Sequence, residues 1–397
     1  MHRTRRLGLG TVLAAVLLSL VVGCGAPGDS ARSALERRLQ TTVDSLRATE
    51  GFPGATAAVV TPAGSVRSVA TGYADREDST RMTPSTRMLG GSTGKSFVAA
   101  VVLSLVAEGL VDLDTPVRRW LGEREWYDRL PNGDALTLRQ LLRHQSGLID
   151  HIHTEAFRRA IEQKMEAEGP DAVLTPEDVV GIVLDTEPLF PAGEGYHYSD
   201  TNYILVGLVV EAVTGRSCYD VLQPRFLDPL QLASTKPADQ RRLPGLASGY
   251  IQGERPFGLP RKVATDGVLV YNPATEWTGG GLVTTSTDLA RWAKALYEGA
   301  ALSGNYLAPL LQGVPKGSTE TARFGPGVRY GLAVTLRSTD LGPAYGHRGW
   351  TPGYLSMFEY YPEHEVAVAV QVNAIDGYDL SSHVVRIARA VVRAPSP

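Results

Sequence analysis

The chain has 397 residues, of which 43% are hydrophobic and 20% are charged. This balance is that of a globular protein with a substantial core, and it excludes a wholly disordered or collagen-like chain. The formal net charge is -3, and no basic run follows the first six residues, so nucleic acid is not expected as a partner.

The N-terminus has the order of a secretory signal. Three arginines within the first six residues precede an apolar stretch over residues 7–22, which is short for a transmembrane helix. The stretch ends at Val21-Val22-Gly23-Cys24, which resembles a bacterial lipobox, whose cysteine becomes the lipidated first residue. We therefore expect residues 1–23 to be a lipoprotein signal peptide, Cys24 to carry the lipid, and residues 24–34 to form a tether.

This signal predicts an exported protein that is anchored to the membrane of a bacterial cell envelope by its N-terminal lipid. An uncleaved membrane anchor is the alternative, and it also places the body of the chain outside the cytoplasm. With Cys24 lipidated, Cys218 is the only other cysteine, so no disulfide is expected.

Hydrophobic periodicity and turn residues predict the elements that follow. Strands are expected over residues 55–61, 66–71, 330–336, 354–361 and 366–372, and helices over 31–48, 92–108, 202–213, 289–297 and 381–392. In the helix-rich middle, Thr137 and Thr175 are expected to begin further helices, the first with a capping box. Strands at both ends of the chain predict an α/β part over about 35–110 and 275–392, with a mostly helical part over about 111–274 inserted between.

The densest chemical signal is Gly90-Gly91-Ser92-Thr93-Gly94-Lys95. Ser92 and Lys95 are three residues apart, so on a helix their polar atoms share one face. A serine hydroxyl becomes a good nucleophile only when a nearby base takes its proton. The chain holds 6 Lys against 33 Arg, and Lys can act as a base whereas Arg stays protonated. The pattern therefore predicts that Lys95 activates Ser92.

Two other motifs overlap this segment. The G-x-S-x-G nucleophile elbow needs a strand immediately before it, and residues 83–89 do not have the pattern of a strand. A phosphate-binding loop needs a glycine five residues before Gly94, and that position is Leu89.

Further segments support the Ser–Lys interpretation. They are Tyr198-Ser199-Asp200-Thr201-Asn202-Tyr203, His347-Arg348-Gly349 with its flanks from Gly346 to Tyr354, and the stretches 136–148 and 279–285. Together with the segment at Ser92, they resemble the motifs of the serine β-lactamase and DD-peptidase superfamily, in its branch of D-alanyl-D-alanine carboxypeptidases, class C β-lactamases and related esterases. The resemblance covers about residues 35–392. It implies a β-lactamase/transpeptidase-like α+β fold, with an antiparallel sheet flanked by helices and the active site between the sheet and the helical part.

The resemblance also implies roles for individual residues. Ser92 would attack a carbonyl and form an acyl-enzyme, with Lys95 as the base and Tyr198 passing a proton to the leaving group. The backbone N–H groups of Ser92 and Trp350, the latter just after Gly349, would form the oxyanion hole. No cofactor is implied.

Two positions depart from the usual motifs. Asp200 stands where the second motif has Asn, and a carboxylate beside Lys95 would favour its ammonium form and weaken it as a base. His347 stands where class C β-lactamases carry Lys, which argues against a dedicated β-lactamase. We expect both to bind or support the substrate.

His151 and His153 invite comparison with a metal pair, but they lack further ligands at suitable spacing, so no metal site is expected. The expected reaction is hydrolysis of a small amide or ester, foremost a peptidoglycan peptide ending in D-Ala-D-Ala. An esterase or weak β-lactamase would use the same residues, and a non-catalytic envelope binding protein that keeps the fold is an alternative of another class.

Overall fold

The computed structural model describes residue 2 and the ranges 27–317, 325–375 and 377–392. Cys24 and the expected signal peptide, apart from residue 2, therefore lie outside the described residues. Helix α1 (Pro27–Glu50) begins within the expected tether, four residues before the predicted start, and proline is tolerated in the first turn of a helix. In the described part of the chain, every helix is too short or too polar to cross a membrane.

A nine-stranded antiparallel sheet forms the centre of the α/β part. Its strands, in spatial order, are β10 (Val314–Pro315), β11 (Arg329–Tyr330), β12 (Thr335–Thr339), β13 (Gly342–Thr351), β14 (Tyr354–Tyr361), β15 (Val366–Val372), β1 (Gly54–Val60), β2 (Val66–Asp75) and β3 (Thr80–Arg81). The first strand of the chain thus pairs with a late one, with Ala55 opposite Val372. This pairing joins the two ends of the chain in one sheet.

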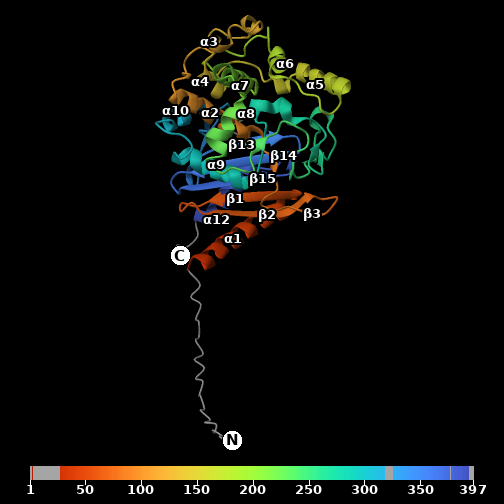
Figure 1. Cartoon of the computed structure of the whole chain (residues 1–397), viewed down its shortest axis with the longest axis vertical. Helices are drawn as coiled ribbons and strands as arrows, with labels where there is room; N and C mark the ends of the chain where they lie inside the picture. Colours follow the sequence, from red (N-terminus) through yellow and green to blue (C-terminus); the bar gives the residue numbers. More distant parts are fainter. Residues whose placement is uncertain (1, 3–26, 318–324, 376, 393–397) are drawn as a thin grey trace.

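Helices cover both faces of this sheet (Figure 1). Every residue of β1 is buried, because successive side chains point to opposite covered faces. Ala57 and Val59 pack in the core beside α1 and α12 (Leu380–Val392), whereas Ala58 and Val60 belong to the core on the opposite face, where α9 (Ser286–Glu298) lies.

The helical part lies beyond α9, at the end of the molecule opposite α1 (Figure 1). Its helices are α3 (Arg118–Leu121), α4 (Leu138–Leu142), α5 (Glu155–Glu168), α6 (Pro176–Gly181), α7 (Thr201–Thr214) and α8 (Cys218–Leu222), and α2 (Lys95–Ala107) and α10 (Leu307–Leu311) pack nearby. Short strands complete the fold: β4 (Met88–Leu89), β9 (Leu282–Thr284) and β5 (Lys236–Pro237) in one sheet, β6 (Tyr250–Ile251) with β16 (Ala374–Ile375), and β7 (Ala264–Thr265) with β8 (Val268–Leu269).

The predicted α+β fold class, an antiparallel sheet with flanking helices, is confirmed. Thr137 forms its capping box with Gln140, and Thr175 caps α6 with Pro at the first helical position. Helix α7 ends at Gly215, whose φ of 66° is typical of a left-handed C-cap.

The strand predicted over residues 330–336 is wrong, because the chain turns inside it. The N–H of Gly331 donates to Val334 O at 2.8 Å, and Ala333 has a φ of 57°. Ala333 N also donates to Leu142 O of the helical part at 3.3 Å, a long-range contact that sequence periodicity does not report. His347-Arg348-Gly349 falls between two of the strands predicted from sequence, at 330–336 and 354–361, but in the structure it lies within β13.

Candidate active site

Ser92 lies on a short 3-10 turn, η1 (Gly91–Gly94), that leads directly into α2. One turn later, Lys95 has 0% exposure, and its Nζ donates a hydrogen bond of 3.0 Å to Ser92 Oγ. The same Nζ donates to the carbonyl of Gly279 and forms an ion pair with Asp200. Ser92 and Lys95 therefore meet on one helix face, as a nucleophile and its base must.

Glycines allow β13 to approach the nucleophile closely. A Cβ on Gly349 would lie 1.9 Å from Gly90 O and 3.2 Å from Ser92 N, and a Cβ on Gly91 would lie 2.8 Å from Trp350 N. Gly91 also has a φ of 52°, a conformation that favours glycine. Side chains at these two positions would separate the turn from the strand.

The approach brings two backbone donors together. β12 pairs with β13 only as far as Gly346, so beyond that residue this edge of β13 lies along η1 instead of another strand. The N–H groups of Ser92 and Trp350 consequently lie at one narrow gap, an arrangement that can hold a developing oxyanion.

Tyr198 completes the group around Ser92. Lys95 Nζ lies 5.2 Å from the centre of its ring. Burial and the charge of Asp200 raise the pKa of the phenol well above its ordinary value, although a hydrogen bond with Ser92 works in the other direction. The phenol is therefore protonated at neutral pH. It can give its proton to another group only if it receives a proton in return.

His144 positions Tyr198, a role that the sequence did not indicate. Its buried ring packs against that of Tyr198, with 4.0 Å between ring centres and 34° between the ring planes. Its Nδ1 accepts from Ser199 N at 3.2 Å and from the Asn202 amide at 3.1 Å. His144 lies in the stretch 136–148, and its contact with the Tyr198 segment depends on how residues far apart in the chain pack.

Three carboxyl groups, those of Asp200, Asp150 and Glu276, lie near Lys95. Asp200 is 8% exposed, and its backbone N–H donates to Asp150 Oδ1 at 3.2 Å. Burial and the neighbouring Asp200 raise the pKa of Asp150 to about 8 and that of Glu276 to about 7. Neither Asp150 nor Glu276 was found from sequence, because neither belongs to a motif of the family.

His347 supports the site as a neutral ring. Its Nδ1 lies 2.7 Å from Arg348 O, and its Nε2 lies 2.7 Å from the Tyr330 hydroxyl. A carbonyl oxygen only accepts, so these partners assign the ring proton to Nδ1, and Nε2 accepts from the phenol. Burial and then the charge of Lys95 lower the pKa of His347 to about 3, so it does not supply the positive charge of the lysine it replaces.

His151 and His153 lie on either side of one carboxylate, with His151 Nδ1 4.0 Å from Asp150 Oδ1 and His153 Nε2 3.7 Å from Asp150 Oδ2, but they differ in exposure. His151 is buried, with Nδ1 3.0 Å from Thr201 Oγ1, whereas the His153 side chain is 82% exposed. Among the described residues, no group of three or more His, Cys, Asp or Glu side chains could hold a metal ion. Cys218 is buried in α8 as a free thiol.

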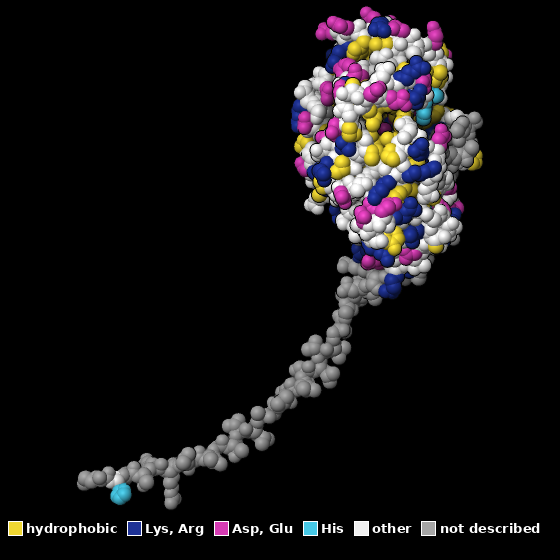
Figure 2. Space-filling model, turned by 90° about the vertical axis from the view of Figure 1, so that its right-hand side faces the viewer, with side chains coloured by type: hydrophobic (Ala, Val, Ile, Leu, Met, Phe, Trp, Pro, Cys, Tyr) yellow, Lys and Arg dark blue, Asp and Glu magenta, His cyan; other side chains and the backbone are white. Residues whose placement is uncertain are grey.

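The Ser92 hydroxyl faces a groove between the helical part and the end of β13. Tyr198, Asp200, His347 and Trp350 line this groove with Ser92. On the face shown in Figure 2, hydrophobic side chains gather around a hollow near the middle of the molecule, with charges of both signs around them. A small substrate can thus reach Ser92 and Trp350 from the groove, whereas Lys95 is fully buried and contacts the serine from within the protein.

Comparisons with known proteins agree with this geometry. A profile of the beta-lactamase family matches residues 39–384. Penicillin-binding protein 4 of Amycolatopsis lactamdurans is 27% identical, over 84% of this chain and 84% of that protein. A D-stereospecific amidohydrolase from Streptomyces sp. has a similar structure, with a TM-score of 0.72 and 27% identity over 90% of this chain and 98% of that one.

The D-amino acid amidase from Ochrobactrum anthropi SV3, solved with D-phenylalanine, has a TM-score of 0.73 and 25% identity over 90% of this chain and 98% of that one. The family profile spans most of the chain, and both structural relatives are hydrolases by name. The protein therefore belongs to the beta-lactamase family and is a serine hydrolase.

Proposed function

We propose that the protein hydrolyses small amides or esters of D-amino acids through an acyl-enzyme on Ser92. The observation that carries the proposal is the 3.0 Å hydrogen bond between Lys95 Nζ and Ser92 Oγ, at the gap that holds the backbone donors. The names of the structural relatives, a D-stereospecific amidohydrolase and a D-amino acid amidase, support the D-amino acid as the acyl group.

In this mechanism the Ser92 oxygen bonds to the substrate carbonyl carbon as its proton passes to the amine form of Lys95. The carbonyl oxygen becomes an oxyanion that accepts from the N–H groups of Ser92 and Trp350. As the tetrahedral intermediate collapses, Tyr198 donates its proton to the leaving nitrogen or oxygen and regains one from Lys95. Water then attacks the ester carbonyl on Ser92 as one of its protons passes to the amine of Lys95. The bond between the acyl group and Ser92 Oγ breaks, that proton passes to Oγ, and the acid is released.

A D-Ala-D-Ala carboxypeptidase-like activity is a second candidate. Lys316 and Arg348 line the groove, and a cation there suits the terminal carboxylate of such a peptide. Penicillin-binding protein 4, by its name, and the expected envelope location also favour this substrate.

The experiment compares D-phenylalanine amide, its L-enantiomer, a D-Ala-D-Ala peptide, nitrocefin and p-nitrophenyl acetate as substrates, with Ser92→Ala as control. Intact-mass spectrometry with the activated ester should show an adduct that Ser92→Ala lacks. An adduct on Ser146 or Ser199 would overturn the site. Turnover of nitrocefin alone would make the protein a β-lactamase, and a wild-type protein with neither adduct nor turnover would be a non-catalytic binding protein.

We further propose export and lipidation at Cys24, as the order of residues 1–24 indicates. Cys24→Ala should release the protein from the membrane fraction of its host. A variant as firmly membrane-bound as the parent would contradict lipidation.

A further inference from the structure

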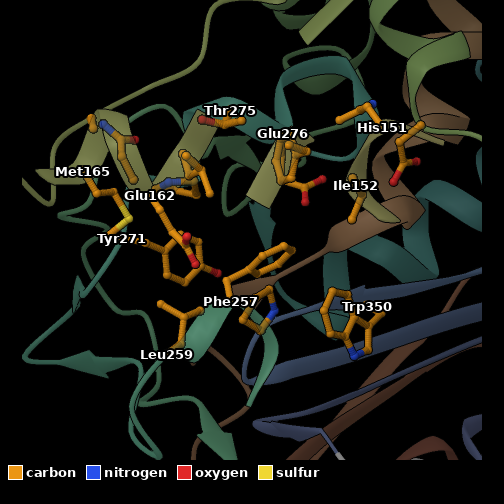
Figure 3. A pocket seen from close by; sticks show the side chains of 17 residues that line it. His151, Ile152, Glu162, Met165, Phe257, Leu259, Tyr271, Thr275, Glu276 and Trp350 are labelled. Carbon is orange, nitrogen blue, oxygen red and sulfur yellow. The ribbon is translucent and has the colours of Figure 1, made fainter. Parts of the chain in front are cut away.

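An apolar chamber adjoins the catalytic groove. Its walls come from α5, from the turn at Pro256–Gly258 with Leu259, and from the segment before β9. The side chains that form its apolar surface are Phe157, Ile161, Met165, Phe257, Leu259 and Tyr271. Figure 3 shows Phe257 in the middle of the labelled side chains, with Met165, Tyr271 and Leu259 on one side of it and Ile152 and Trp350 on the other.

The chamber opens from the groove instead of forming a separate cavity. Ile152, Asp200, Phe257, Glu276 and Trp350 line both spaces. Phe257, the wall between them, has a φ of 54°, an unusual conformation for a bulky residue, and such strain is often found at binding sites. When the carbonyl oxygen of a substrate accepts a hydrogen bond from Trp350 N, a group attached to that carbonyl can therefore enter the chamber.

The position of Tyr198 indicates whether the chamber takes the acyl group or the leaving group of the substrate. The leaving group must lie beside Tyr198 to receive its proton. Tyr198, His347 and Lys316 line the groove but not the chamber, whereas Trp350 and Asp200 line both. The chamber consequently lies on the side of the acyl group, away from the leaving group.

Charge restricts the acyl group further. The chamber lining contains no Lys or Arg among the described residues, but it includes Glu162, Asp200 and Glu276. His151 is uncharged at neutral pH, because burial lowers its pKa to about 4. An anionic acyl group would have to enter without a partner, which is costly.

Glu276 lies where the chamber meets the groove. Asp200 is engaged by Lys95, but the Glu276 side chain makes no hydrogen bond or ion pair to another described residue. In Figure 3 its carboxylate points toward the space between Phe257 and Ile152. Burial raises the pKa of this carboxyl group to about 7, and a cationic substituent next to the carbonyl would meet the group and stabilise its ionised form.

We infer that the chamber binds the hydrophobic side chain of an α-amino acyl group whose ammonium is held by Glu276. The inference rests on the proposed function and narrows its substrates to amides and esters of large apolar amino acids with a free amino group. It disfavours N-acylated peptides as acyl donors.

The first test fills the chamber. Met165→Trp should lower kcat/KM for D-phenylalanine p-nitroanilide by about tenfold or more, because a bulky side chain would occupy the pocket, and pockets discriminate side chains by factors of this size. It should lower kcat/KM for p-nitrophenyl acetate, whose acyl group is too small to enter, by a smaller factor. Gln163→Trp, at an exposed site of α5 outside the chamber lining, is the matched control. An unchanged ratio of D-phenylalanine to D-alanine p-nitroanilide in Met165→Trp would overturn the pocket.

The second test concerns the ammonium. The wild type should prefer D-phenylalanine p-nitroanilide over its N-acetyl form by about tenfold or more, and Glu276→Gln should reduce that preference to about threefold or less, as removal of a close charge partner does. Equal rates for the two forms in the wild type would overturn the role of Glu276. If the wild type fails on p-nitrophenyl acetate as well, the proposed function fails, not the inference about the chamber.

Discussion

The ammonium of Lys95 forms an ion pair with the carboxylate of Asp200 while it donates a hydrogen bond to the Ser92 hydroxyl. The base of the proposed reaction is thus held beside a negative charge in a buried site. Lys95 Nζ is therefore shared between the carboxylate of Asp200 and the serine that it must activate.

Asp200→Asn should therefore raise the acylation rate, by about tenfold as changes in a close charge pair often do, because Lys95 Nζ would no longer be shared with a carboxylate. The substitution removes the charge and keeps the shape. The measurement is the acylation rate of both proteins with one activated ester. Equal rates would mean that the ion pair with Asp200 does not influence the reaction.

Gly349→Ala should lower kcat/KM by at least about 100-fold, the usual effect of losing one oxyanion-hole donor. Its Cβ would lie 1.9 Å from Gly90 O, so either η1 or β13 must move and the two backbone donors separate. Gly181→Ala is the control, since its Cβ would meet nothing within 4 Å at an exposed position of α6. Steady-state kinetics and circular dichroism of both variants check this, and near-normal activity of a folded Gly349→Ala would refute the oxyanion assignment.

Tyr330→Phe should lower the free energy of unfolding by about 1–3 kcal/mol, because His347 Nε2 would lose its donor and remain buried without a partner. Denaturant titration gives the value. Tyr345→Phe is a suitable comparison, since Tyr345 lies on β13 and is only partly buried. A Tyr330→Phe protein as stable as Tyr345→Phe would show that the phenol is not the donor to His347.

His151 should make the protein less stable in acid. Its pKa is about 4 in the folded protein against 6.5 ordinarily, so between these values the unfolded chain binds a proton that the folded protein does not. The free energy of unfolding should then fall with falling pH, by at most about 1.4 kcal/mol per pH unit from this group. The neighbouring Asp150, with a raised pKa, acts in the opposite direction.

The comparison of His151→Gln with wild type isolates the contribution of His151. On acidification from pH 6.5 to 4, the free energy of unfolding of the variant should fall less, or rise more, than that of the wild type, because Asp150 contributes to both proteins. His153→Gln, at a side chain 82% exposed, should follow the wild type. Equal slopes for all three proteins would mean that His151 titrates normally.

Local sequence determined the features that depend on neighbouring residues. The spacing of Ser92 and Lys95 within one helical turn brings their polar atoms together, and Thr137 caps α4 through atoms within three residues. The family motifs indicated the class of fold. These features follow from short-range geometry, so they can be predicted from sequence without knowledge of the packing.

Tertiary structure alone decided the features that join distant segments. Trp350 N reaches the gap beside Ser92 because β12 ends its pairing at Gly346. Asp150 and Glu276 lie near Asp200 only because three segments that are far apart in sequence pack together. Packing against the helical part also turns the chain at Ala333, within a predicted strand. The side-chain environment of Lys95, and with it the chemistry of the site, is set by contacts between residues far apart in sequence, whose proximity no local pattern encodes.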